Sequence, residues 1–339
     1  MFATIKAIEF HLPTHCLTND DLATAFPEWP VEKIAAKTGI SKRFYTLDGE
    51  CSSDLGFEAA LKLFKKNDID PAEIDYLLFC TQSPDYFLPT TACILQNRLG
   101  IPTHAGALDF NLGCSGFIYG LGLAKALIET SQAKKVLLIT AETYTKFIHP
   151  QDKSVRTIFG DAGAATLVAA RNSSRPALGP FIYGTDGSGY QNLIVPTGGL
   201  RNPKGKEDCL AQEDVSGNVR SKENLFMDRQ ELFNFTIKTV PKTIDQLLKK
   251  AQLDLDDIDF FVFHQANRFM LEYLRKKTML PKEKFLYSLK EYGNTVSSTI
   301  PIALKNKTDD GTILPGNKVM LVGFGVGYSW GATLLDWQC

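Results

Sequence analysis

Two stretches of the chain repeat each other, and this internal repeat constrains the fold more than any other feature. KKNDIDPAEIDYLLFC (65–80) matches KKAQLDLDDIDFFVFH (249–264) without a gap at an offset of 184, and KKVLLI (134–139) matches NKVMLV (317–322) at an offset of 183. The longer stretches each join an amphipathic helix to a short apolar strand, which is typical of α/β proteins. The sequence therefore predicts two copies of one α/β unit that pack as a pseudo-twofold pair and share a cleft.

The repeat divides the chain into two expected halves, residues 1–175 and 176–339. The equivalent strands of the two halves end in different residues. The first strand ends in Cys80 and the second in His264. Because α/β proteins keep their chemistry at the carboxyl ends of strands, this divergence makes His264 a candidate site residue. A polar, Gly- and Pro-rich stretch at 184–209 is expected to pass over the active face, and its alternative is a disordered linker.

Cys114 lies where a short apolar strand passes into an apolar helix, in the sequence DFNLGCSGFIYGLG (109–122). The small residues on both sides let the backbone turn sharply and let another molecule approach the sulfur. The apolar run that follows predicts a helix buried on all sides, and the N-terminal end of a helix favours a thiolate over a thiol. The alternative is a small buried cysteine that only fills a tight corner.

Three further segments carry candidate site residues. His264 ends the strand DFFVF and opens HQAN, Asn294 stands in YGNTVSST, and VGFGVGYSWGATLL (322–335) has glycines that let backbone amides point into a cavity. Taken singly, the histidine and the asparagine have structural alternatives, as a satisfied core histidine and as a turn or cap residue. The glycine segment fits neither GxGxxG nor a P-loop, so nucleotide binding by these routes is not expected.

Composition narrows the classes of function. A net charge of −1 over 339 residues, with 44% hydrophobic and 11% aromatic residues, indicates a globular protein without an electrostatic bias toward nucleic acid or an anionic membrane. Seven cysteines without a CxxC pair predict neither a disulfide framework nor a metal cluster. The N-terminal residues lack a leader pattern, and no apolar run reaches the ~18 residues of a membrane helix, so a cytoplasmic protein is expected.

Together the motifs LGCSGF, HQAN, YGNT and GFGVGYSWG, in this order and at this spacing, resemble the β-ketoacyl-acyl-carrier-protein synthase III family of the thiolase superfamily. The resemblance extends to KTGISKR, LPTTACILQNRLG and FGDAGAATLV, and so covers nearly the whole chain. It implies a five-layered αβαβα fold of two duplicated halves, a homodimer, and no metal or redox cofactor. The implied reaction is a decarboxylative condensation of an acyl-CoA with a malonyl thioester of acyl-carrier protein, giving a β-ketoacyl product in fatty-acid or related biosynthesis.

The resemblance also implies a role for each motif. Cys114 takes up the acyl group, while His264 and Asn294 donate hydrogen bonds to the malonyl carbonyl oxygen as carbon dioxide leaves. Phe87 and Leu88 correspond to a pocket wall that the partner subunit contributes. The residues implied to hold the oxyanion or to line the active site are Phe324, Gly325, Val326 and Gly327.

The position that commonly helps to dock the carrier protein departs from the family's pattern. Phe269 stands there instead of an arginine. Arg268 and Arg275 lie seven residues apart on the helix that HQAN opens, and therefore on one face of it. We expect these two arginines to form the docking patch, and the alternative is an ordinary solvated helix surface.

The positions expected to contact CoA also depart in part. Lys153 stands where an arginine is usual near the CoA phosphates, with Arg156 close by, and Lys37 keeps a basic position beside the adenine. Trp29 does not align with the tryptophan that stacks on the adenine, because it lies nine residues before Thr38 instead of about five.

Two other classes of function remain alternatives. A thioester hydrolase or acyltransferase would use the same cysteine, and papain-like hydrolases also have Cys, His and Asn in this order. The duplication disfavours the papain-like arrangement because it puts Cys114 in one half and the other two residues in the second. A non-catalytic acyl-binding partner subunit is disfavoured by the retention of all three. The starter acyl group, and whether the malonyl donor is a carrier protein or CoA, stay open.

Overall fold

The first half of the chain folds around a five-stranded mixed sheet. The computed structural model describes all of residues 1–339. The strands lie in the order β1 (Phe2–His11), β7 (Ala162–Arg171), β6 (Lys135–Glu142), β4 (Tyr76–Cys80) and β5 (Gly106–Phe110). β4 is parallel to β5 and β6, whereas β7 is antiparallel to β6 and β1.

The second half repeats this topology with one strand fewer. Its sheet has the order β8 (Leu178–Thr185), β15 (Ser329–Asp336), β14 (Lys318–Gly325) and β13 (Phe260–Phe263). β13 and β14 are parallel, and the other two pairs are antiparallel, as in β4, β6, β7 and β1. The internal repeat is thus confirmed as a repeat of topology. The expected boundary between residues 175 and 176 falls in the connection from β7 to β8.

Equivalent residues of the repeat make equivalent contacts. α3 (Ser52–Asn67) and α7 (Arg229–Ala251) both end in a left-handed residue, and a 3-10 turn then leads into β4 or β13. The Asp75 carboxylate accepts the backbone N–H of Lys135 at 2.9 Å, and the Asp259 carboxylate accepts that of Lys318 at 2.7 Å. Each aspartate therefore fixes the start of the next parallel strand.

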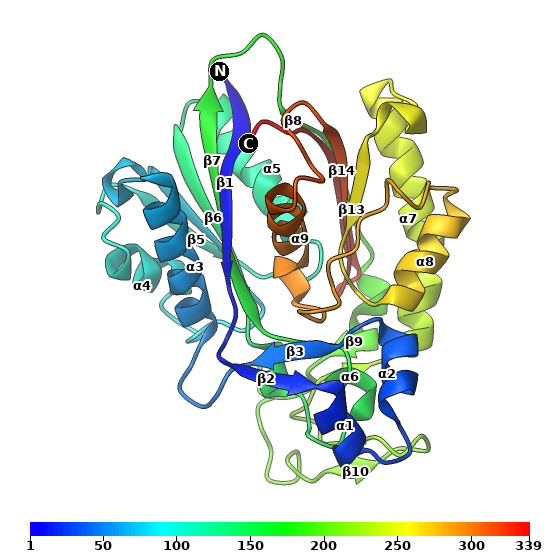
Figure 1. The fold of residues 1–339 in the computed structure, drawn as a ribbon. Coiled ribbons are helices and arrows are strands. Elements are labelled where there is room, and N and C mark those ends of the chain that lie inside the picture. Colours follow the sequence, from blue (N-terminus) through cyan, green and yellow to red (C-terminus); the bar gives the residue numbers. More distant parts are fainter.

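The elements form the five layers that the family resemblance implies. α5 (Gly116–Glu129) and α9 (Thr299–Asp309) lie between the two sheets (Figure 1). α3 and α4 (Thr91–Arg98) cover the outer face of the first sheet, and α7 and α8 (Arg268–Lys277) cover that of the second. The order αβαβα is confirmed.

The central helix α5 is less enclosed than its apolar sequence indicates. Phe117, Ile118 and Leu121 are fully buried, but Leu123 is 40% exposed. The expectation of burial on all sides is wrong because the two sheets cover opposite faces of the central layer and leave one flank of α5 open.

The remaining elements lie below the layers in Figure 1 or connect them. None of the helices combines the length and the apolar character that a membrane crossing needs. The short strands are β2 (His15–Thr18) with β3 (Lys42–Tyr45), β9 (Leu193–Ile194) with β12 (Phe226–Met227), and β10 (Gln212–Glu213) with β11 (Val219–Arg220). The other helices are α1 (Asn19–Ala25), α2 (Val31–Thr38), α6 (Lys153–Arg156), and the 3-10 turns η1 (Pro71–Glu73), η2 (Tyr144–Phe147), η3 (Gly187–Asn192), η4 (Leu255–Asp257) and η5 (Val296–Ser298).

Candidate active site

One cavity of about 750 Å³ brings the three candidate catalytic residues together. Cys114 from the first half, and His264 and Asn294 from the second half, all line it. Thirteen of its 23 lining residues are hydrophobic, so a bound thioester would be held largely away from water. Leu193, from the stretch expected to pass over the active face, also lines it.

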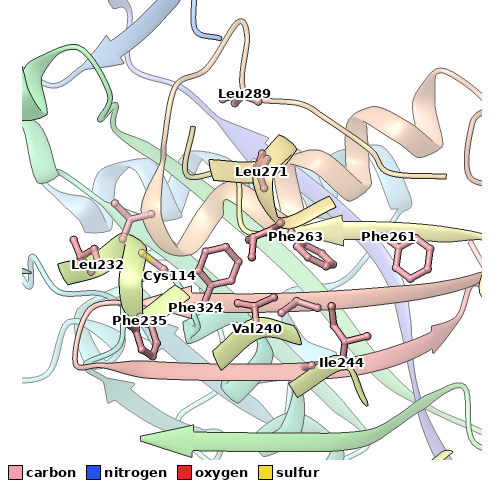
Figure 2. Close-up of a cluster of buried hydrophobic side chains, with 14 of the residues drawn as sticks. Cys114, Leu232, Phe235, Val240, Ile244, Phe261, Phe263, Leu271, Leu289 and Phe324 are labelled. Atoms are coloured by element: carbon pink, nitrogen blue, oxygen red, sulfur yellow. The ribbon is translucent and has the colours of Figure 1, made fainter. Parts of the chain in front are cut away.

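Cys114 lies two residues before α5, against the end of β14. It belongs to the buried apolar cluster of Figure 2, together with Phe324 and Leu232. A Cβ added at Gly325 would lie 2.7 Å from the Cys114 sulfur. The glycine in β14 is therefore what lets the strand and its amides come this close to the sulfur.

Burial raises the pKa of the Cys114 thiol to about 12, because a thiolate at this position loses its solvation. The backbone amides of Val326 and of Cys114 itself favour the thiolate, and the carboxyl of Glu142 opposes it. Desolvation thus outweighs the helix end. The helix end favours the thiolate as expected, but it does not make the thiolate the main form in the isolated chain.

His264 follows β13 and is 2% exposed. Its backbone N–H donates to the Val322 carbonyl at 2.8 Å, and its ring Nδ1 lies 2.7 Å from Thr299 Oγ1. Burial lowers the pKa of the ring to about 3, although the Val296 carbonyl acts in the opposite direction. The imidazole is therefore neutral near pH 7 and offers one hydrogen-bond donor and one acceptor.

Asn294 is fixed on both sides of its backbone by the segment before β7. Its N–H donates to the Ile158 carbonyl at 2.9 Å, and its carbonyl accepts from Gly160 N–H at 3.0 Å. Its side-chain Oδ1 accepts the Val296 N–H at 2.9 Å. The preceding Gly293 has a φ of 72°, and a Cβ there would lie 2.9 Å from the Ile158 carbonyl oxygen. This arrangement leaves Asn294 Nδ2 as a donor to the cavity.

The other residues assigned by the glycine motif lie at different distances from the cavity. Phe324 and Gly325 line it, and the Phe324 ring stands edge-on to His264 with the centroids 5.7 Å apart. Val326 and Gly327 do not line it, although the Val326 amide faces the Cys114 sulfur.

Phe87 and Leu88 lie outside this cavity. Each is 83% exposed, so neither side chain forms a wall of the site in its own chain. Their assignment to a partner subunit's pocket stays a prediction.

The cavity mouth contains a tryptophan that the sequence comparison set aside. Trp29 lines the cavity, and the Lys37 ammonium lies 4.5 Å from its ring centroid. Phe233 and Phe269 also line this part, with their ring centroids 5.8 Å apart. Trp29 thus provides an aromatic face beside a lysine despite its shifted position in the sequence.

Lys153 and Arg156, expected near the CoA phosphates, do not line the main cavity. Lys153 is only 14% exposed and pairs with Glu28 at 2.5 Å. Arg156 donates to the Pro150 carbonyl and lines a smaller, separate cavity. Because Glu28 directly precedes Trp29, Lys153 lies near the cavity mouth, and contact of either cation with CoA phosphates stays a prediction.

Arg268 and Arg275 do not form the free basic patch that their spacing predicts. Both contact Glu272, Arg268 at 3.4 Å and Arg275 at 3.0 Å. The Arg275 side chain is only 15% exposed and also donates to the Leu280 carbonyl. Arg268 lies over the ring of Tyr287. The shared carboxylate offsets much of their charge, and the prediction is wrong for Arg275.

Two site residues were missed in the sequence. Arg229 begins α7 and lines the cavity, where it donates to the Ser154 carbonyl. Glu142, at the end of β6, is fully buried and accepts from Gln82 N–H at 3.0 Å and Ser297 Oγ at 2.9 Å. Burial raises the pKa of Glu142 to about 8. No group of three or more His, Cys, Asp or Glu side chains has the arrangement of a metal site.

We expect the alkylation rate of Cys114 by iodoacetamide to rise about tenfold for each pH unit between pH 7 and pH 9, without a plateau. With the pKa of the thiol raised above this range, the reactive thiolate fraction increases with each step. Peptide mapping by mass spectrometry separates this site from the exposed Cys93 and Cys209. A plateau below pH 8 would instead show a thiolate that the helix end has already stabilised.

A five-layered fold of this topology, with a cysteine, a histidine and an asparagine at one buried cavity, is that of a condensing acyltransferase of the thiolase fold. Family models for 3-oxoacyl-[acyl-carrier-protein] synthase III and for its C-terminal part match residues 108–187 and 248–337. The chain belongs to the β-ketoacyl-[acyl-carrier-protein] synthase III family.

Relatives and solved structures agree along the whole length. The chain is 35% identical to the synthase III of Caldanaerobacter subterraneus subsp. tengcongensis, over 97% of this chain and 96% of the relative, and 36% identical to that of Clostridium tetani, over 96% of both. A crystal structure of a 3-oxoacyl-(acyl-carrier-protein) synthase III has 52% identity and a TM-score of 0.98, covering 99% of this chain and all of the other. The synthase from Burkholderia xenovorans LB400 has 39% identity and a TM-score of 0.91, covering 100% and 95%.

Proposed function

We propose that the chain condenses an acyl group taken from acyl-CoA with malonyl-acyl-carrier protein, with loss of carbon dioxide, in fatty-acid biosynthesis. One observation carries this proposal. A cysteine from one half, and two neutral hydrogen-bond donors from the other, meet at a single apolar cavity. The chemistry needs no metal or redox cofactor.

In the first half-reaction the Cys114 sulfur attacks the carbonyl carbon of the acyl-CoA thioester. The backbone amides of Cys114 and Val326 are placed to hold the oxyanion, because both already face the sulfur. Each such donor is typically worth about a hundred- to thousand-fold in rate. The carbon–sulfur bond to CoA then breaks, CoA leaves as the thiol with the proton that Cys114 gave up, and an acyl-Cys114 thioester remains.

In the second half-reaction the malonyl thioester carbonyl accepts hydrogen bonds from Asn294 Nδ2 and from the ring of His264. The bond to the malonyl carboxylate breaks, its electron pair enters the enolate, and carbon dioxide leaves. The enolate carbon attacks the acyl carbon of acyl-Cys114, and the bond from that carbon to sulfur breaks. The sulfur leaves as a thiolate, which takes up a proton from water, and the β-ketoacyl product departs. Neutral donors suit this step because a negatively charged neighbour would oppose the enolate.

The tautomer of His264 depends on which acceptor takes the hydroxyl hydrogen of Thr299. The hydroxyl lies 2.7 Å from His264 Nδ1 and 3.1 Å from the Val296 carbonyl, so its single hydrogen has two acceptors. When that hydrogen goes to Nδ1, the imidazole carries its own hydrogen on Nε2, where the reaction needs a donor.

A thioester hydrolase of the same fold is separated from a synthase by incubation with acetyl-CoA alone. The synthase takes up one acetyl group per chain, and CoA release stops at one equivalent. A hydrolase releases CoA and acetate through many turnovers. Sustained acetate release, with no β-ketoacyl product when malonyl-acyl-carrier protein is added, would favour the hydrolase.

The carrier protein is expected to dock on lysines beside the cavity mouth. A groove between α7 and α8 is lined by Lys238, Lys242 and Lys277 and by no carboxylate. It adjoins the mouth because Phe233, which lines the cavity, packs edge-on against Tyr273, one helical turn before Lys277. A basic groove leading to the tunnel suits an acidic carrier that delivers a tethered thioester.

Reversing these charges by K238E, K242E and K277E is expected to raise the apparent KM for malonyl-acyl-carrier protein about tenfold at low salt, with acetylation by acetyl-CoA unchanged. The control is the triple variant K65E, K249E and K282E, which changes three other exposed lysines by the same charge. If both triple variants have the same carrier-protein kinetics, docking does not use this groove. If the double variant R268E and R275E raises this KM more than the lysine variant does, the carrier protein docks on those arginines instead.

We also propose that the chain acts as a homodimer in the cytoplasm. β5 is the edge strand of the first sheet, and Phe87 and Leu88 are large apolar side chains almost fully in solvent, a combination that favours a covering partner. All seven cysteines are free thiols, which fits a reducing compartment. Sedimentation at the mass of one chain would contradict the dimer.

A further inference from the structure

We propose that a hydrogen-bonded pair, Tyr144 and Gln82, closes the space behind the Cys114 sulfur and limits the starter to a short acyl group such as acetyl or propionyl. This inference rests on the proposed function, because it concerns the acyl group that Cys114 takes from CoA. It names two residues, neither of which lines the cavity, as the determinants of starter length.

The cavity ends at the nucleophile. Cys114 and Phe159 line it, whereas Tyr144, Gln82 and Val296 do not. These side chains belong to the wall beyond it, since Tyr144 and Val296 share one buried cluster with Cys114 and Phe159. The Tyr144 ring packs on Phe159 with the centroids 5.4 Å apart.

The backbone next to Cys114 shows how little room lies behind it. A Cβ added at Gly113 would lie 2.5 Å from Gln82 Oε1, 2.7 Å from Val326 Cγ1 and 3.2 Å from Val296 Cγ1. Three side chains thus lie close to Gly113, the residue before the nucleophile. A methyl group there would fit only if one of these side chains moved.

Hydrogen bonds hold both members of the pair in place. The Tyr144 hydroxyl donates to Gln82 Oε1, and Gln82 Nε2 donates to Asn111 Oδ1 at 3.1 Å. The Gln82 backbone N–H donates to the buried carboxyl of Glu142 at 3.0 Å. Tyr144 is 4% exposed, so moving it would leave its buried hydroxyl without a partner, which is costly.

The direction of the substrate makes this wall the one that meets the acyl chain. The pantetheine arm of CoA enters from the mouth at Trp29 and Phe269, and its thioester must reach Cys114 at the far end. The acyl group on the other side of the thioester carbon therefore points away from the mouth, toward Phe159 and the Tyr144–Gln82 pair. Each methylene that does not fit is typically worth about tenfold or more in discrimination.

The test compares acyl adducts of the wild-type protein, Y144A and Y144F by intact-protein mass spectrometry, using acetyl-, propionyl-, hexanoyl- and octanoyl-CoA. Y144A removes the ring, whereas Y144F is the matched control that keeps its volume and loses only the hydroxyl. We expect a low octanoyl-to-acetyl labelling ratio for the wild type and Y144F, and a ratio raised about tenfold or more for Y144A.

Equally fast octanoyl and acetyl labelling of the wild type would overturn the proposal, and so would a Y144A variant that is acetylated with an unchanged ratio. If circular dichroism shows that Y144A does not fold, Q82A decides in its place, because it opens the same wall from the other member of the pair. A wild-type protein that no acyl-CoA labels would contradict the proposed function itself, which separates the two failures.

Discussion

Replacing Cys114 by alanine is expected to abolish both uptake of the acyl group and formation of the β-ketoacyl product. No other cysteine lines the cavity, so no second thiol can take over the attack on the thioester. Intact-protein mass spectrometry after exposure to acetyl-CoA measures the uptake, and chromatography of the carrier protein measures the product.

The matched control is the double variant C93A and C209A, which removes two exposed thiols and should still be acetylated once per chain. A stoichiometric adduct on C114A that maps to another cysteine would contradict the assignment of the nucleophile. Loss of the adduct in the double variant would contradict it as well.

Replacing His264 or Asn294 by alanine is expected to slow decarboxylation of the malonyl donor by about a hundred- to thousand-fold while leaving acetylation of Cys114 within a few-fold of the wild type. Each substitution removes one proposed donor to the enolate oxygen, and neither removes the amides of Cys114 and Val326 that we propose for the first oxyanion. Release of labelled carbon dioxide and the rate of the acetyl adduct report the two steps separately.

Substitutions of a histidine and an asparagine on the surface, H104A and N172A, serve as controls and should change neither step. If H264A or N294A instead loses acetylation and still decarboxylates malonyl-acyl-carrier protein, the roles of the two half-sites are reversed.

The repeat could be recognised in the sequence because several of its residues fix the backbone in the same way in both copies. Asp75 and Asp259 each hold the start of the neighbouring parallel strand, and Asp68 and Gln252 each end a helix in the left-handed region. Such tasks are local, so the aspartate is the same residue in both copies, whereas the helix ends share only the left-handed backbone. Topology then follows, because the same helix and strand units pair in the same order.

The three candidate catalytic residues were predictable because each follows or precedes a strand or helix in a distinctive motif. The residues around them were not. In the sequence, Glu142 is an acidic residue at the end of an apolar strand, with no sign that it is buried. Its hydrogen-bond partners, Gln82 and Ser297, come from distant parts of the chain. The raised pKa of Cys114 was missed for the same reason. The helix end can be predicted from local sequence, whereas the burial that raises the pKa of the thiol depends on distant residues.

The ion pairs of the basic candidates were not part of the sequence prediction, and only some of them could have been read from helical spacing. Lys153 pairs with Glu28, 125 residues away, which no local pattern indicates. The pairing of Arg268 and Arg275 with Glu272 was readable, because Glu272 lies four residues after one and three before the other, the spacings at which helical side chains meet.

A chase on one sample tests most directly whether Cys114 carries the acyl group into the condensation. The protein is loaded with acetyl-CoA, freed of CoA and weighed, and malonyl-acyl-carrier protein is then added while adduct, carbon dioxide and β-ketoacyl-carrier protein are followed together. We predict that the adduct on Cys114 disappears at the rate at which both products appear, one for one. Product that forms while the adduct persists, or an adduct lost as free acetate, would contradict acyl-Cys114 as the intermediate of the condensation.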